Sequence, residues 1–196
     1  MARPLVANPL SLLLAVLVWL AHPWAGLAAS DGEALGSALV TPPPQLSLPL
    51  AEQLADYAVR LCQRSGSFVS ATVVTATGAP QVMLSGDGAV PHSRGLSQQK
   101  AYTAVSMAAL QGLHTTSELQ DALAHPRFSI GNLGMPSDPV AQITPVPGGV
   151  VIRWQGAVLA GLGVSGARQG SIDERCALDA EERLLQVLNQ PTTPPV

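Results

Sequence analysis

Residues 150–164 read VVIRWQGAVLAGLGV, and the fold class follows from this stretch. Its two apolar runs, residues 150–154 and 157–164, are separated only by Gln155 and Gly156. So short a connection between two β-rich runs is typical of a β-hairpin, whose strands are antiparallel. The C-terminal half of the chain therefore contains an antiparallel pair of strands.

Three further strands are predicted on the N-terminal side of this hairpin. Residues 68–75 (FVSATVVT) and 81–85 (QVMLS) are β-rich, and Gly78 between them can supply the positive φ that a tight turn needs. A short strand is also predicted at residues 142–145, ahead of the glycine turn at 148–149.

Four helices are predicted around these strands. The first follows Ser47 and ends at Gly66, and the second spans residues 97–111. The third and fourth begin at the capping-box sequences TTSE (115–118) and SIDE (171–174). Because no helix crosses over between paired strands, we expect an antiparallel sheet with helices packed on it, which is the α+β class.

The composition excludes several classes of protein. Of the 196 residues, 47% are hydrophobic and only 12% are charged, and the formal net charge is -3. Proteins that bind nucleic acids or anionic lipids carry clusters of lysine and arginine, so neither kind of partner is expected. A disordered charged chain needs low hydrophobicity and high net charge, and this chain has neither.

The two ends of the chain differ from the part between them. Residues 1–29 place Arg3 before an apolar run at 10–20, with small residues after it, which is the order of a secretory signal peptide. The run is shorter than the ~20 residues of a spanning helix, so we expect cleavage; the alternative is an uncleaved N-terminal anchor. The remaining parts are a Pro-rich linker (30–45), one domain (46–190) and a Pro/Thr tail (191–196).

Two glycine-rich motif matches do not carry the chemistry that they suggest. Residues 161–166 (GLGVSG) match the dinucleotide-binding pattern, but that site needs another strand downstream, and only one helix and a tail follow. Residues 163–167 (GVSGA) fall one glycine short of a nucleophile elbow, and no histidine follows Ser165. The glycines instead predict close packing of this strand against another backbone or a ligand.

The histidines and the single lysine are the candidate ligand-binding residues. His92 precedes the second helix and His114 follows it, so about 15 residues at ~1.5 Å each keep them roughly 22 Å apart. One metal within the chain cannot take both; each is a solvated loop histidine, a single axial ligand, or half of a pair shared between subunits. Lys100 is either a surface residue or the partner of Asp87 or of a ligand carboxylate.

The two cysteines, Cys62 and Cys176, fall on or beside the apolar stripes of the first and last helices. An even cysteine count in an exported protein favours a disulfide. Two buried free thiols are the alternative, because free cysteine is often fully buried.

Seven short segments, taken in order, resemble the GlcG/HbpS family of haem-binding proteins, which also occurs as the C-terminal domain of PduO-type proteins. The segments are VVTATG (73–78), DGA (87–89), KAYTA (100–104), TSEL (116–119), PGG (147–149), GLGVSGA (161–167) and DERCA (173–177). The chain departs from the family at Thr75, where the family has aspartate, and at residues 85–86, where it often has Arg-Met. The resemblance implies a profilin-like α+β fold, with a five-stranded antiparallel sheet and helices on both faces. The first and last helices would then be adjacent, which favours the Cys62–Cys176 contact.

The resemblance also implies a haem site. In the family a threonine after the second helix lies near bound haem, which points to Thr116 and its neighbour His114 in this chain. Of the two side chains, the imidazole is the better iron ligand. The helix at 97–111 and the strand at 161–166 would offer a flat surface to the porphyrin. The candidate residues are therefore His114 as iron ligand, Thr116, His92, and Arg94, Lys100 or Arg127 for the propionates.

We accordingly expect an exported, homo-oligomeric protein of a bacterial periplasm or exterior that binds haem or another tetrapyrrole. One rival is an enzyme that degrades haem oxidatively or transforms another small molecule. The other is an oligomeric interaction module without a cofactor. No membrane span is expected after signal cleavage.

Overall fold

The computed structural model describes residues 44–124 and 143–190. The predicted signal peptide, most of the linker, the tail and Arg127 lie outside the described residues. The elements are α3 (Leu48–Arg64), β1 (Ser70–Thr75), β2 (Pro80–Ser85), α4 (Ser93–Thr103), the π-helical turn η1 (Ala104–Ala108), the 3-10 turn η2 (Ala109–Gln111), α5 (Thr116–Ala124), β3 (Gly149–Trp154), β4 (Ala157–Ser165) and α6 (Gly170–Leu188).

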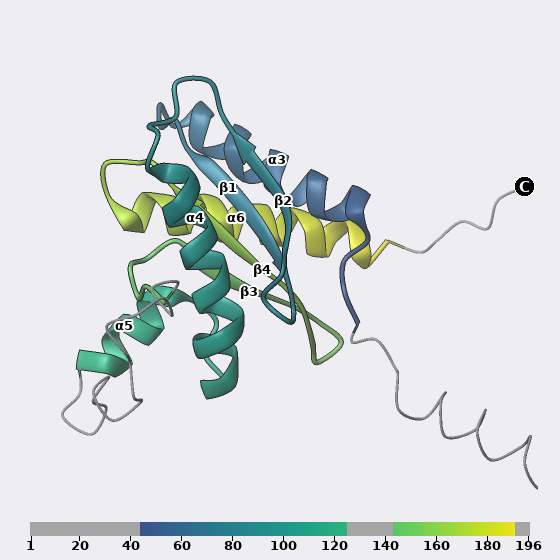
Figure 1. Ribbon diagram of the computed structural model, residues 1–196. Coiled ribbons are helices and arrows are strands. Elements are labelled where there is room, and N and C mark those ends of the chain that lie inside the picture. The colour runs from purple at the N-terminus through teal and green to yellow at the C-terminus, as the bar shows by residue number, and fades with distance from the viewer. Residues whose placement is uncertain (1–43, 125–142, 191–196) are drawn as a thin grey trace, which may run out of the picture. The chain divides into compact units, whose positions relative to one another are not determined.

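The described strands form one antiparallel sheet in the order β2-β1-β4-β3 (Figure 1). Both predicted hairpins are confirmed, and so is the α+β class. The described residues contain four strands rather than the expected five, because residues 143–145 are not a strand. A single bridge between Thr115 and Val150 extends the sheet beyond β3.

Residues 143–145 do not form the predicted strand, because side chains form hydrogen bonds with the backbone groups of this segment. The amide of Thr144 donates to Oγ1 of Thr103, and the carbonyl of Val146 accepts from Oγ1 of Thr116. Pro145 and Pro147 bring no amide hydrogen to a strand ladder. The segment is therefore tied to α4 and α5 instead of to a neighbouring strand.

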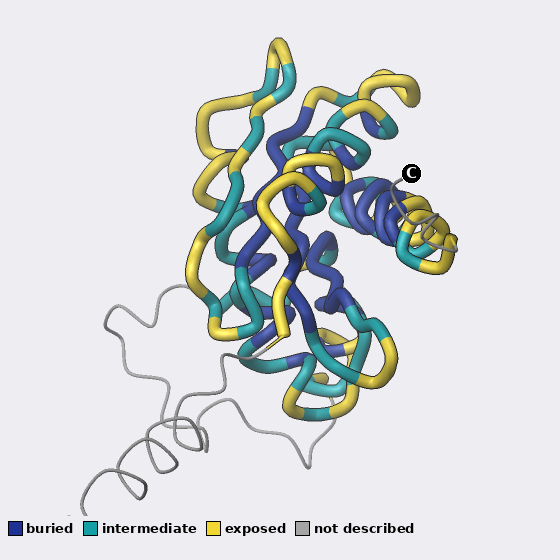
Figure 2. Tube along the Cα trace, turned by 90° about the vertical axis from the view of Figure 1, so that its right-hand side faces the viewer, coloured by how far each residue is buried: buried dark blue, intermediate teal, exposed yellow. Residues whose placement is uncertain are grey.

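Helices cover both faces of the sheet (Figure 1). Side chains of a strand alternate between the faces, and Val73 packs in a core cluster with α3 and α6, whereas Val74 packs with α4. Val150 and Ile152 likewise join the α3 and α6 cluster, and Val151 joins the cluster under η1 and α5. In Figure 2 the buried stretches of the chain, in dark blue, run through the middle of the domain.

Helix α4 lies unusually close to β4. A Cβ on Gly161 would overlap the carbonyl oxygen of Ala101, and a Cβ on Gly163 would overlap that of Ser97. The glycines of this strand therefore allow two backbones to pack closely. Of the two alternatives predicted from the sequence, packing against another backbone is confirmed. The expectation that this strand presents a flat surface to a porphyrin is wrong, because α4 covers that surface.

Two helices begin earlier than predicted. Helix α4 begins at Ser93 rather than at residue 97. Helix α6 begins at Gly170, after Gln169, and no side chain caps it. The capping box predicted at 171–174 does not form, because its acidic residues, Asp173 and Glu174, bind partners elsewhere in the fold.

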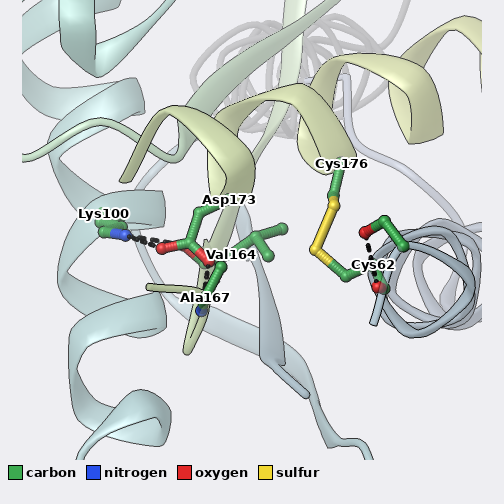
Figure 3. The surroundings of a disulfide bond; sticks show 7 residues. Cys62, Lys100, Val164, Ala167, Asp173 and Cys176 are labelled. Carbon is green, nitrogen blue, oxygen red and sulfur yellow. Dashed lines mark hydrogen bonds and ion pairs between the residues drawn. A yellow bond between two sulfur atoms is a disulfide. The ribbon is translucent and has the colours of Figure 1, made fainter. Parts of the chain in front are cut away.

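Cys62 and Cys176 form a disulfide, with their Cα atoms 5.5 Å apart (Figure 3). The bond joins α3 to α6, the first and last described helices, across 114 residues of sequence. The disulfide interpretation is confirmed, and the alternative of two free thiols is wrong.

No helix among the described residues combines the length and the apolar character that crossing a bilayer requires.

Candidate functional site

Lys100 forms a buried ion pair with Asp173 (Figure 3). Its Nζ donates to Oδ2 of Asp173 over 2.8 Å and to the carbonyl of Val164 over 2.9 Å. The lysine side chain is only 1% exposed. Lys100 is therefore neither a surface residue nor the partner of Asp87, and both of those expectations are wrong.

The attraction between Lys100 and Asp173 is opposed by the cost of removing both charges from water. Burial lowers the pKa of Lys100, and the nearby charge of Asp173 opposes that shift. Burial likewise raises the pKa of Asp173, against the charge of Lys100 and the amide of Ala167. The ammonium is thus held inside the protein, where it ties α4 to the start of α6.

His114 lies at the β3 edge of the sheet. Its carbonyl accepts from the amide of Val151, and its own amide donates to Oε2 of Glu118 over 2.7 Å. Its ring Nε2 lies 2.8 Å from Oε2 of Glu181 on α6. The His114 side chain is 45% exposed, whereas that of Glu181 is 7% exposed. One side of the imidazole is held by a buried carboxylate while the ring remains accessible.

The surroundings of His114 favour its protonated form. The hydrogen bond to Glu181 raises the pKa of His114, and the negative charges of Glu181 and Glu118 act in the same direction. Burial and the positive charge of Arg153 on β3 oppose this shift without reversing it.

Thr116 is close to His114 in sequence but is fully buried. Its Oγ1 donates to the carbonyl of Val146 and accepts from the amide of Gly149, at 2.9 Å each. Both hydrogen bonds hold the chain that enters β3. The hydroxyl is therefore used in positioning this edge of the sheet.

Glu174 joins the same edge to α6. It accepts from the hydroxyl and the amide of Ser117 and from the amide of Gly148. Glu174 and Glu181 are seven residues apart on one face of α6. The two carboxylates therefore fix the segment that carries His114.

His92 and Arg94 lie away from this edge. Arg94, the second residue of α4, lies beside β2, where its Nε donates to Oγ of Ser85 over 3.2 Å, and His92 is exposed just before the helix. Since β2 and β3 are opposite edges of the sheet, the structure does not bring these two residues to His114. Arg127 lies outside the described residues.

Three partner residues on α6 were not predicted from the sequence: Asp173, Glu174 and Glu181. All three are buried acids on the inner face of α6. The available signal was the position of Glu181, which falls four residues after Ala177 and thus within the apolar stripe. Among the described residues, no group of three or more potential ligands could hold a metal by itself.

Comparison with known proteins identifies the family. Residues 46–182 match the family model described as "Haem degrading protein HbpS-like". No curated protein matches the chain at a significant level.

Solved structures agree with this match. The crystal structure of HbpS is 34% identical, with a TM-score of 0.63, and the match covers 76% of this chain and 95% of that one. A Streptomyces reticuli HbpS double mutant is 28% identical, with a TM-score of 0.63 and coverage of 94% and 98%. PduOC in complex with haem is 28% identical, with a TM-score of 0.59 and coverage of 70% and 94%. The chain belongs to the HbpS-like family.

Proposed function

We propose that this protein binds haem at the β3 edge, with His114 as the protein ligand of the iron. The observation that carries the proposal is the accessible imidazole of His114, fixed on one side by the buried Glu181. In metal-ligating histidines, the N–H of the second ring nitrogen commonly donates a hydrogen bond to a carboxylate in this way. The family match and the haem complex of PduOC support haem as the group that is bound.

The described residues fit haem better than a bare metal ion. Haem brings four nitrogen ligands of its own, so one imidazole suffices. Exposed apolar surface lies just before His114, since Leu110 is 83% exposed and Leu113 is half-buried. Arg153 is near enough for its charge to lower the pKa of His114, and a cation there can pair with a propionate.

The other candidate residues that the structure describes do not belong to this proposed site. The ammonium of Lys100 is buried and bound to Asp173, and the hydroxyl of Thr116 is buried and hydrogen-bonded twice. His92 and Arg94 lie toward the β2 edge, and neither takes part in the proposed haem site.

Titration of the purified chain with ferric hemin tests the proposal. We expect a shifted and sharpened Soret band that saturates at a fixed ratio of hemin to protein. A spectrum equal to the sum of free hemin and protein would contradict haem binding.

Haem degradation is the second candidate function, because the matching family model is described as haem-degrading. Adding a reductant and oxygen to the haem complex separates the two functions. With an enzyme, the Soret band would disappear while a linear tetrapyrrole and iron are released. With a binding protein, the Soret band would decay no faster than that of free hemin.

We also propose that the protein is exported. The order of charge, apolar run and small residues at 1–29 supports this, as does the Cys62–Cys176 disulfide, since such bonds persist mainly in oxidising compartments. Expression in a bacterium followed by N-terminal sequencing of the periplasmic fraction checks it. We expect the mature chain to begin near Ser30; a full-length chain in the membrane fraction would contradict cleavage.

Self-association is part of the same proposal. The outer edge of β2 has no strand partner among the described residues, and Met83 on it and Leu48 beside it are exposed. Such edges tend to pair with another chain. Light scattering during size-exclusion chromatography should give a mass of at least two chains; a monomer mass at micromolar concentration would contradict it.

A further inference from the structure

We propose that Glu181 is a positioning residue that selects which nitrogen of His114 is presented to a ligand. Glu181 holds the hydrogen on Nε2, and Nδ1 is left as the ring nitrogen that can bind iron. The inference rests on the proposed function for the identity of the ligand, but the state of the imidazole can be measured without haem.

The hydrogen bond between the two side chains assigns the tautomer. An ionised carboxylate only accepts hydrogen bonds, so Nε2 of His114 must be the donor across the 2.8 Å to Oε2 of Glu181. The neutral ring then carries no hydrogen on Nδ1. In this neutral form Nδ1 has no hydrogen-bond partner among the described residues, and its lone pair can bind a ligand.

The position of Glu181 makes this constraint rigid. Glu181 lies on the inner face of α6, is 6% exposed as a residue, and sits between Ala180 and Leu184, which pack in the main core. Helix α6 is itself fixed by the Cys62–Cys176 disulfide and by the pair of Asp173 with Lys100. The backbone that carries the carboxylate is therefore held in place, and the side chain has little access to solvent.

The other charged groups near the ring do not replace Glu181. Glu118 on α5 accepts from the backbone amide of His114, and Arg153 on β3 donates to the carbonyl of Ala109. Neither is hydrogen-bonded to the imidazole. Among the described residues, the side chain that is hydrogen-bonded to the ring is therefore Glu181 of α6.

The opposite role for Glu181 gives the opposite result. If iron bound through Nε2, Glu181 would have to leave, and it would act as a competitor. Removing it would then strengthen haem binding, whereas removing a positioning residue weakens it. Losses of a group that orients a metal ligand typically reduce affinity by about 10- to 100-fold.

Three variants test the inference. Glu181→Ala removes the acceptor, and Glu181→Gln keeps an oxygen that can accept from Nε2 while removing the charge. Glu182→Ala is the matched control, because Glu182 is the next residue of α6, carries the same charge and is exposed. Melting temperatures of all three show whether each variant is folded before binding is compared.

The first measurement is long-range ¹H–¹⁵N NMR of the haem-free protein, at a pH where His114 is neutral. We expect hydrogen on Nε2 in the wild type, in Glu181→Gln and in Glu182→Ala, and a mixture of tautomers in Glu181→Ala. A wild-type ring with hydrogen on Nδ1, or an unchanged ring in Glu181→Ala, would overturn the inference.

The second measurement is hemin affinity. We expect Glu181→Ala to bind about 10- to 100-fold more weakly than the wild type, and Glu181→Gln and Glu182→Ala to stay within about threefold. Equal or tighter binding by Glu181→Ala would overturn the inference while leaving haem binding intact. Absence of hemin binding by the wild type would instead refute the proposed function, and the NMR result would still decide the tautomer.

Discussion

Lys100 and Asp173 place two opposite charges inside the protein, where each depends on the other. Replacing Lys100 by methionine keeps much of the side-chain volume but leaves the Asp173 carboxylate buried without a cation. We expect Lys100→Met to lower the free energy of unfolding by about 3–5 kcal/mol at neutral pH. Urea denaturation measures this change.

The second replacement Asp173→Asn should recover part of that loss in Lys100→Met, because no unpaired charge then remains. Arg60→Met, which breaks the exposed pair of Arg60 with Asp56, is the matched control and should leave stability unchanged. Equal effects of the buried and the exposed replacement would contradict a role for the buried pair.

His114 should make stability depend on pH. Its folded-state pKa is raised, chiefly by the hydrogen bond to Glu181, so protonation favours the folded state. This contribution is complete below the unfolded pKa of about 6.5 and is lost as the pH rises through the folded pKa. NMR titration of the haem-free protein should therefore show His114 titrating at lower pH in Glu181→Gln than in the wild type. An unchanged midpoint would contradict the assigned cause.

At the level of single residues, the sequence located His114 but not the groups that act on it. The sequence alone shows that His114 lies in a predicted loop, two residues before the TSEL segment that the family shares. Glu181 is 67 residues away, and its pairing with His114 depends on how α6 packs against the sheet. Lys100 was misplaced for the same reason, since its partner is 73 residues away.

At the level of helices and strands, the contact of α4 with β4 leaves no room for an added Cβ atom at Gly163. An alanine at Gly163 would place a Cβ against the backbone of Ser97 and Ala101. Helix α4 would have to move, so we expect Gly163→Ala to cost about 1–3 kcal/mol or more. Gly95, on α4 itself, has open space around it, so Gly95→Ala is the control and should be neutral or stabilising. Thermal melts compare the two, and equal melting temperatures would contradict the close approach.

Local pattern was sufficient for the hairpins but not for every boundary. Both hairpins are encoded by apolar runs with glycine turns, which act over a few residues. The predicted strand does not form at residues 143–145, nor the capping box at 171–174, because their groups bind partners from distant elements, such as Thr103 and Ser117. Tertiary contacts of this kind leave no mark in the local sequence.

For the domain as a whole, the disulfide is the longest covalent constraint. It joins residues 114 positions apart, and closing so long a loop restricts the unfolded chain strongly. We expect Cys62→Ala/Cys176→Ala to lose about 2–5 kcal/mol, near the upper end of what disulfides contribute. Reductant should lower the melting temperature of the wild type toward that of the variant and leave the variant unchanged. A wild type insensitive to full reduction would contradict this role.

The measurement that tests the account most directly is the hemin affinity of His114→Ala compared with that of His92→Ala. Both variants lose one imidazole, but His92 lies toward the opposite edge of the sheet from His114. We predict that His114→Ala loses the shifted Soret band or binds hemin at least about tenfold more weakly, and that His92→Ala binds as the wild type does. Wild-type affinity and spectrum in His114→Ala would contradict the assignment of His114 as the iron ligand.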